Sequence, residues 1–284
     1  LTARVRVNRI WQKLFGTGIV PGVDYFGARG DVPTHPELLD HLAARFTDMG
    51  WSQKRLIRDL VLSRTYRLTS ANEDGAMRVD PENKLYWRMN RQRIDAEALR
   101  DSLLAVSGEL RPSRGGPGLV LENPENCSAL ALKGVNPPAY RHAKPRPNQD
   151  FERTIYLPVF RNSFTNSDRL RGIFDFIDPA GTAGQRNQTV VPTQALFLLN
   201  NDLVRRRAQV LAERLLASGG EDGTRLEARW LRVFNLPITP AERQEAAAFI
   251  HQLTQLGNPA KSAAAHWTEL CHSLLSSNEF VFRL

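Results

Sequence analysis

The sequence of 284 residues has little cysteine and no long apolar run, and each shortage excludes a class of protein. The two cysteines, Cys127 and Cys271, can form at most one disulfide, and their spacing fits no zinc motif. No run approaches the roughly 18 apolar residues that a membrane-spanning helix needs. A disulfide-stapled scaffold, a zinc module and a membrane span are therefore not expected, and the redox compartment stays open.

Familiar catalytic and cofactor motifs are also missing. No G-x-S-x-G nucleophile elbow is present, and no serine has a recognisable base partner nearby. Gly16, Gly18 and Gly22 have the wrong spacing for a dinucleotide fingerprint and follow a predicted helix, so this stretch is interpreted as a loop. The haem attachment motif C-x-x-C-H is absent, because Cys271-His272 lacks the first cysteine. We expect no cofactor in this chain.

The histidines do not have the spacing of a helical metal site. His35 and His41 lie six residues apart, as do His266 and His272. Six residues place two side chains on different faces of a helix, whereas metal ligands there are usually four apart. Structural or solvent-facing roles are therefore favoured, and no metal site is predicted.

The net charge of +8 and the pI near 9.9 raise the question of a polyanionic partner. The basic residues are scattered from Arg4 to Arg283, and the only run is Arg205–Arg207. Nucleic-acid domains usually concentrate basic charge on one face and combine it with aromatic or Gly-rich elements, which are absent here. The pattern argues against nucleic acid and leaves open an anionic polymer, an acidic partner, or no polyanion at all.

Helical periodicity dominates what the sequence does contain. Its length and 42% hydrophobic content allow about 75% of the unfolded chain's surface to be buried, enough for one large domain or two packed lobes. Apolar residues recur at helical spacing over residues 3–15, 37–49, after Ser52, from Asp95, and over 192–216, 221–234, 240–256 and 263–280. We predict an N-terminal helical lobe at 1–110, a Pro- and Gly-rich loop or excursion at 111–150, and a C-terminal helical lobe at 151–284, packed as one domain.

Two short patterns refine this prediction of a mainly α fold. The T-x-x-E sequences at Thr34–Glu37 and Thr239–Glu242 predict helix caps, each with Pro in the first turn. Residues 154–160, TIYLPVF, are typical of a strand, limited by Pro158 to a sheet edge or a bulge. The segment from Ile173 can pair with it, which gives a small β element around residues 153–177.

The most informative segment runs from Ile173 to Val204. A nearly all-apolar helix is predicted to begin near Pro192, with Thr193 as its cap or in its first turn, and to form the buried hub of the fold. The polar loop Gly181–Thr189 precedes it. The free N–H groups and the partly positive end of that helix make the loop a candidate site for anions.

Polar residues around this segment are the candidate ligand-binding residues, and no catalytic residue can be named. They are Asp175, Asp178, Arg186, Asn187, Arg161 and Asn162. The two carboxylates could divide acid and base roles if their environments differed. The favoured alternative is an ion pair of Asp175 or Asp178 with Arg186 that fixes the loop before the helix. Arg161 and Asn162 could meet an anion or satisfy loop backbone groups.

Several segments together resemble one family of bacterial domains. They are ARVRVNRIWQKLFGTGIV, DYFGARGDVPTHPELLDHLAARF, WSQKRLIRDLVLSRTYRLTS, RMNRQRIDAEALRDSLLAVSGEL, the FDFIDP to QALFLLNN segment, and SLLSSNEFVF. In this order they span nearly the whole chain and resemble the planctomycete-type C-terminal domain of unknown function fifteen-fifty-three. The resemblance implies a C-terminal domain of a large exported bacterial protein, periplasmic or at the cell surface, often accompanied by a cytochrome c segment and a companion domain of unknown function. It implies no catalytic residues.

Two functional hypotheses follow. The first is a non-catalytic assembly or ligand-binding module that packs against neighbouring domains of its parent protein, where any covalent haem would be held. It fits the helical architecture, the missing catalytic motifs and a chain that begins at Leu1, already close to a predicted helix. The second is an enzyme acting on an extracellular polymer such as an acidic polysaccharide, with Asp175, Asp178 and Arg186 in its cleft. Polar groups converging on a deep pocket would favour the enzyme, and exposed apolar patches would favour assembly.

Overall fold

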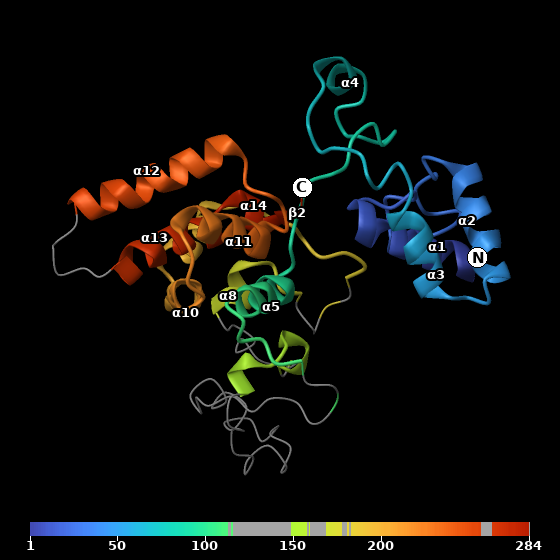
Figure 1. The fold of residues 1–284 in the computed structure, drawn as a ribbon. Coiled ribbons are helices and arrows are strands. Elements are labelled where there is room, and N and C mark those ends of the chain that lie inside the picture. The colour runs from blue at the N-terminus through green and yellow to red at the C-terminus, as the bar shows by residue number, and fades with distance from the viewer. Residues whose placement is uncertain are drawn as a thin grey trace, which may run out of the picture. The chain divides into compact units, whose positions relative to one another are not determined.

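The computed structural model describes residues 1–112, 115, 149–157, 159, 169–177, 181, 183–256 and 263–283 (Figure 1). These residues are mainly α-helical with one two-stranded sheet, which confirms the predicted fold class. The chain forms two compact units. Unit 1 comprises Leu1–Arg93, Ala183–Gln185 and Phe282–Leu284, and unit 2 comprises Ile94–Thr182 and Arg186–Val281.

Unit 1 is built on a helical core from the N-terminal part of the chain. Its helices are α1 (Thr2–Phe15), α2 (Pro36–Asp48), α3 (Gln53–Val61) and the short α4 (Asp74–Val79). α1 and α2 pack against each other through apolar stripes that recur every three or four residues. Trp11 stacks on Phe15 with ring centroids 4.0 Å apart, and its indole N–H donates to the Tyr86 hydroxyl at 2.8 Å. The core aromatics are thereby fixed in one arrangement.

The glycine-rich stretch after α1 is a loop, as predicted. The Asn8 side chain pairs with both backbone groups of Val20, donating to its carbonyl and accepting from its N–H at 2.9 Å each. A Cβ at Gly18 would lie 2.4 Å from the Val20 carbonyl oxygen, so only glycine fits there. Gly16 ends α1 with a φ of 91°, a value that glycine adopts without strain.

The only sheet among the described residues joins β1 (Gln92–Arg93) to β2 (Phe282–Arg283) within unit 1. The strands are antiparallel, with Gln92 opposite Arg283. Arg283 also donates to the Leu14 carbonyl, so β2 is tied to the end of α1 as well. Two-residue strands carry no periodic signal, which is why the sequence did not predict them.

Unit 2 contains the remaining helices. They are α5 (Ala96–Val106), the 3-10 turns η1 (Gln149–Phe151) and η2 (Thr154–Tyr156), α8 (Arg169–Ile173), α9 (Pro192–Asn200), α10 (Asp202–Ala217), α11 (Asp222–Phe234), α12 (Pro240–Leu256), α13 (Ala263–Leu275) and α14 (Asn278–Val281). α5, which falls in the predicted lobe 1–110, packs against α10 and η2 in unit 2. None of the described helices is long and apolar enough to cross a membrane.

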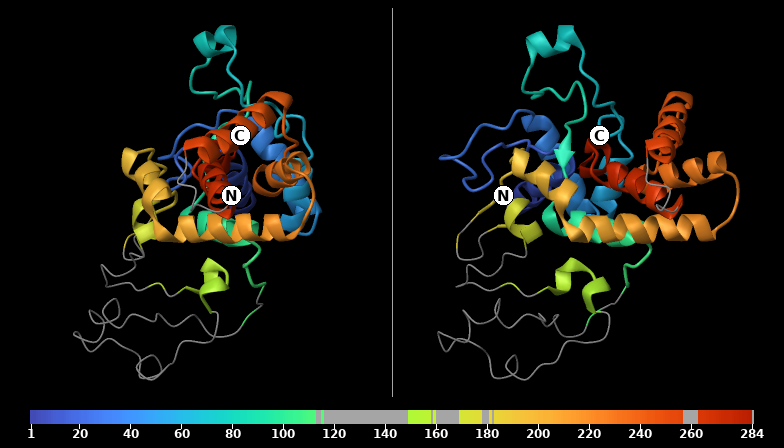
Figure 2. Two further views of the ribbon diagram at one scale, coloured as in Figure 1. Left: turned by 60° about the vertical axis from the view of Figure 1, so that its left-hand side comes forward. Right: turned by 90° about the vertical axis from the view of Figure 1, so that its left-hand side faces the viewer.

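The centre of unit 2 is the pair α10 and α13, which lie side by side (Figures 1 and 2). Ala208 and Ala212 lie one turn apart on α10 and are fully buried, as are Cys271 and Leu275 on α13. Small side chains on one helix leave room for the larger ones of its neighbour. Burial raises the pKa of the Cys271 thiol to about 11, so this cysteine is an inert core residue at neutral pH.

The predicted hub helix is wrong in two respects. First, the stretch 192–216 is two helices, because Asn201 is extended and its side chain caps α10 by accepting from the Leu203 N–H at 2.8 Å. Second, α9 buries Phe197 and Leu198 but exposes Leu196 and Leu199, whereas the hub of the unit is α10 with α13. An apolar helix sequence indicates that burial of its side chains is favourable, but it does not show that other residues of the same chain bury them.

The predicted strand at 154–160 is also wrong in its described part. Residues Thr154–Tyr156 form η2, and Ile173 ends α8. The nearest β contact is an isolated parallel bridge between Arg111 and Glu152. The described residues between 153 and 177 therefore contain no strand, and the sheet of the described part is formed by β1 and β2. The Thr154 backbone N–H bonds to a carboxylate on α5 rather than to a partner strand.

The two T-x-x-E patterns behave differently. At Thr239, both halves of the capping box form, with the Thr239 N–H donating to Glu242 at 2.7 Å and the Glu242 N–H donating to the Thr239 hydroxyl at 3.3 Å. At α2, the cap residue is His35, without a side-chain cap bond, and the Thr34 hydroxyl donates to the Ile19 carbonyl instead. The predicted helix is present, but its predicted cap is wrong.

Candidate functional site

Three of the six candidate residues lie in the described part of the chain. Asp178, Arg161 and Asn162 lie outside the described residues, as does Cys127. Asp175, Arg186 and Asn187 are described, and they belong to unit 2. Asn187 is exposed.

Arg186 pairs with a carboxylate on α5. Its two terminal nitrogens donate to the two oxygens of Glu97 at 2.6 and 2.7 Å, and Asp95 lies 3.8 Å from one of them. This two-bond geometry is the strongest form of an arginine–carboxylate pair. The predicted pairing of Arg186 with Asp175 is therefore wrong, because the partner comes from a helix that lies 89 residues earlier in the chain.

The pair is partly buried, but the contact between the two groups outweighs the effect of burial and favours their charged forms. Burial alone would raise the pKa of Glu97, but hydrogen bonds and positive charge from Arg186 outweigh it, so the pKa lies below its usual value. The hydrogen bonds that Arg186 donates to Glu97 raise the pKa of Arg186. A carboxylate held in its ionised form by a bound guanidinium is poorly suited to donate a proton at neutral pH.

The ring of Phe176 lies close to two guanidinium groups. The Arg171 guanidinium carbon is 5.1 Å from the ring centroid and that of Arg186 is 5.5 Å from it. Arg171 is almost fully buried, with 2% of its surface exposed, and its charge also helps to lower the pKa of Glu97. Cations over an aromatic face are attracted by its quadrupole. The cluster therefore anchors the start of the loop that follows α8.

Asp175 holds the other end of the same loop. It has a φ of 56°, in the left-handed region that Asp tolerates better than most residues. Its carboxylate accepts from the Thr189 N–H at 2.7 Å and from the Thr189 hydroxyl at 2.9 Å. Gln194 of α9 donates to the Ile173 carbonyl and to the Thr189 hydroxyl. These bonds join the end of α8 to the start of α9 and give Asp175 a structural role.

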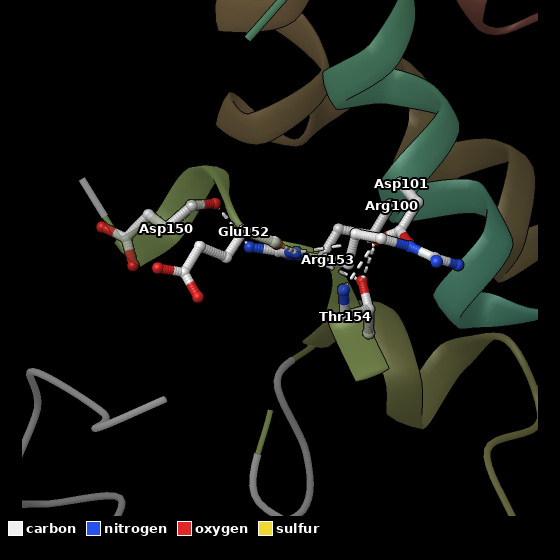
Figure 3. Close-up of polar contacts among 6 residues, drawn as sticks. All are labelled: Arg100, Asp101, Asp150, Glu152, Arg153 and Thr154. Carbon is white, nitrogen blue, oxygen red and sulfur yellow. Dashed lines mark hydrogen bonds and ion pairs between the residues drawn. The ribbon is translucent and has the colours of Figure 1, made fainter. Parts of the chain in front are cut away.

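A second polar network, which no sequence pattern indicated, fixes η1 and η2 to α5 (Figure 3). Arg100 donates to the carbonyls of Asp150 and Glu152 at 2.6 and 2.9 Å, and to the Thr154 hydroxyl at 3.1 Å. Asp101 accepts from the backbone N–H and the hydroxyl of Thr154 at 2.7 and 2.6 Å. Adjacent arginine and aspartate residues on a helix are common, and their distant partners cannot be read from the sequence.

Several apolar side chains are exposed on α9 and directly before it. Val190, Val191, Leu196 and Leu199, which we call the α9 face, are 72, 39, 56 and 51% exposed. The helix sequence PTQALFLLN contains no charged residue. Its opposite side is fixed in unit 2 by edge-to-face packing of Phe197 on Phe174. Large apolar side chains exposed close together in the sequence of a folded domain indicate an interaction site.

The described residues do not assemble a metal centre. Among them, no group of three or more His, Cys, Asp or Glu side chains could hold a metal ion. His272 bonds to the Leu198 carbonyl at 3.0 Å, which accounts for one of the buried histidines. Three cavities of the described part of the chain lie in unit 1 and are lined by neither Asp175 nor Arg186.

The family can now be assigned. The model of PSD1, described as Protein of unknown function (DUF1553), matches residues 1–250. The chain belongs to this family. No curated protein and no solved structure matches it. The family match covers unit 1 except Phe282–Leu284, and most of unit 2, including Asp175, Arg186 and α9.

Proposed function

We propose that this PSD1 chain is a non-catalytic assembly module, which uses the α9 face to pack against another domain of its parent protein. The observation that carries the proposal is the exposure of Leu196 and Leu199 on a helix without charge. Burying a leucine side chain contributes about 1.5–3 kcal/mol, so two half-exposed leucines and two valines represent a substantial gain on association.

The candidate polar residues support assembly rather than catalysis. Asp175 is engaged by Thr189, and Arg186 by Glu97, and each contact fixes a loop end next to α8 or α9. A general acid or base needs a side chain that is free to reach a substrate, with a pKa near the working pH. The anchors instead hold Val190 and Val191 in position, directly before α9.

The family resemblance supports a partner within the parent protein. Domains of this kind are expected at the C-terminal end of exported proteins that also carry a companion domain and often a cytochrome c segment. An apolar, uncharged helix face fits a permanent contact inside such a protein, because lasting interfaces are more apolar than transient ones. Any haem would belong to the partner segment, and the module would hold that segment in place.

The test measures binding of this chain to the remaining domains of its parent, purified separately, by isothermal titration calorimetry. Replacing both Leu196 and Leu199 by Glu is expected to weaken binding at least tenfold, since two charges would be buried in an apolar contact. The matched control replaces Leu231 and Leu236 by Glu, because these leucines are equally exposed and lie in and just after α11. Binding that survives the α9 variant but not the control would contradict the proposal.

A further inference from the structure

A hollow in unit 1 combines basic side chains with an aliphatic floor. It has a volume of about 430 Å³ and lies between α1 and α3, with Ala183 and Gly184 on its wall. We call it the α1–α3 hollow. Gly184 lies so close to Val23 and Asp24 that a Cβ would clash with both. Asp24 is not among the lining residues, and no carboxylate is.

The cations of the hollow are available to a ligand. Arg6, Arg9 and Lys13 lie at spacings of three and four, on one side of α1. Arg6 donates to the Gln53 side chain at 2.6 Å, which holds it across the opening toward α3. Arg9 and Lys13 are exposed and have no ion pair in the described part of the chain. By contrast, Arg4 on the same helix is already paired with Asp40.

A buried polar group in the hollow lacks a partner. Gln12 is 6% exposed and lines the hollow, and its amide nitrogen has no hydrogen-bond acceptor. A buried donor without an acceptor costs about 1–3 kcal/mol. A carboxylate or carbonyl oxygen that enters the hollow would supply the missing acceptor.

The basic surface continues over α3. A second, more open hollow of about 500 Å³ is lined by Lys54, Arg55 and Arg58, together with Ile57 and Val61. Ile57 lines both hollows, so they adjoin at this half-exposed side chain. Six cations and no carboxylate therefore line two neighbouring hollows whose shared centre is aliphatic.

We infer that the α1–α3 hollow and its neighbour bind an acidic protein segment that carries an aliphatic anchor side chain. The cations match clustered Asp and Glu, which gives charge complementarity and fast association. The floor of Ile10, Leu14 and Ile57 matches a Leu, Ile or Val side chain placed among those acids.

The lining favours such a segment over other polyanions. Single-stranded nucleic acid is held by stacking its bases on aromatic side chains, and no aromatic residue lines either hollow. An acidic polysaccharide is polar along its whole length and would gain nothing from the aliphatic floor. The site is separate from the α9 face in both residues and chemistry, so it stands without the proposed function.

Fluorescence anisotropy of a labelled peptide, Glu-Glu-Asp-Leu-Leu-Asp-Glu-Glu, tests the inference on the full chain. A second peptide replaces both leucines by serine and keeps the charge. The leucine peptide is expected to bind at least about fivefold more tightly, and raising the salt concentration should weaken both. Arg9→Glu should reduce the affinity about tenfold, since it inverts one of the facing charges.

The control variant is Arg78→Glu, which changes the net charge equally at an exposed position on α4. It should bind the peptide as the unmodified chain does. Equal affinity for the two peptides, or equal effects of Arg9→Glu and Arg78→Glu, would overturn the inference. The inference would also be overturned if an alginate oligosaccharide or a single-stranded DNA of the same charge bound more tightly than the leucine peptide, because the ligand would then belong to another class.

Discussion

Arg186 and Glu97 form a two-bond ion pair across 89 residues of sequence, with nitrogen–oxygen distances of 2.6 and 2.7 Å. Their side chains are about three-quarters buried, at 23 and 27% exposure. The pair ties the loop before α9 to α5, while Asp175, just after α8, binds Thr189 near the end of the same loop. Asp175 and Arg186, which the sequence suggested as ligand-binding residues, thus hold the loop that positions α9.

Removing one partner of this pair should destabilise unit 2. Glu97→Gln is expected to lower the free energy of unfolding by about 2 kcal/mol near neutral pH, because hydrogen bonds to charged groups are lost and Arg186 stays partly buried. Urea denaturation followed by circular dichroism measures the change. A matched substitution, Glu213→Gln, alters an exposed carboxylate on α10 and should cost far less.

The contribution of Glu97 should depend on pH in one direction. Its pKa in the folded state is lowered, against 4.5 ordinarily, because the bonds and charge of Arg186 outweigh the desolvation that would raise it. The stabilisation is therefore complete above about pH 4.5 and is lost as the pH falls through the folded-state pKa. The stability difference between the unmodified chain and Glu97→Gln should shrink from about pH 6 to about pH 3. A difference that grows on acidification would refute this sign.

Asp175 offers a test between anchor and catalyst. Asp175→Ala should speed amide hydrogen exchange in residues 186–191, since both bonds to Thr189 are lost. Asp175→Asn keeps one carbonyl oxygen and tolerates the φ of 56°, so its effect should be smaller. If Asp175→Asn abolished a measured turnover without changing the exchange, the anchor role would be wrong and an enzyme would be favoured.

The two T-x-x-E sequences show what local patterns can and cannot predict. Pro is favoured at the first helical position, so the residue before it becomes the cap. In Thr239-Pro240-Ala241-Glu242 this places Thr at the cap and Glu three residues later, and the box forms. In Thr34-His35-Pro36-Glu37 the same rule makes His35 the cap, so Thr34 is one residue too early. The helix was predictable from periodicity, and its cap from the position of Pro.

This difference predicts unequal costs for the same substitution. Thr239→Ala should lower stability by about 1 kcal/mol, the usual loss for a Thr cap. Thr34→Ala should cost less, because the Thr34 hydroxyl caps no helix N–H and bonds only to the Ile19 carbonyl at 3.2 Å and to the neighbouring His35 ring at 3.0 Å, at a partly buried site. Thermal unfolding of the two variants compares them directly. A larger loss at Thr34 would mean that its bonds to Ile19 and His35 contribute more than a capping box.

The parts of the fold that sequence did not predict share one cause. The partners of Arg186, Arg100 and Asp101 lie 50 to 89 residues away, and the strands β1 and β2 are two residues long. None of these contacts leaves a periodic trace. The apolar content of α9 was visible, but which side is covered depends on the tertiary contacts of α8, α10 and α13.

The close pairing of α10 with α13 gives a prediction for core volume. Ala212 is fully buried, so Ala212→Leu should destabilise unit 2 by about 1–3 kcal/mol or more through overpacking. Ala247 lies exposed on α12, and Ala247→Leu should change stability little. Thermal denaturation of both variants measures the two changes in stability. Equal small effects would show that α10 and α13 can move apart at no cost.

Gln12 links the stability of unit 1 to binding in the α1–α3 hollow. Gln12→Met keeps the length of the side chain and removes the unpartnered amide, so the free chain should be stabilised by about 1 kcal/mol. The same change should weaken binding of the leucine peptide severalfold, because an oxygen of the peptide loses its donor. Thermal unfolding and anisotropy measure the two effects on one preparation. Gln209→Met, at an exposed position on α10, should alter neither. A stabilised Gln12→Met variant that binds the peptide at full strength would show that the amide has no role in binding. Higher stability combined with lower affinity is the result that a preformed binding group requires.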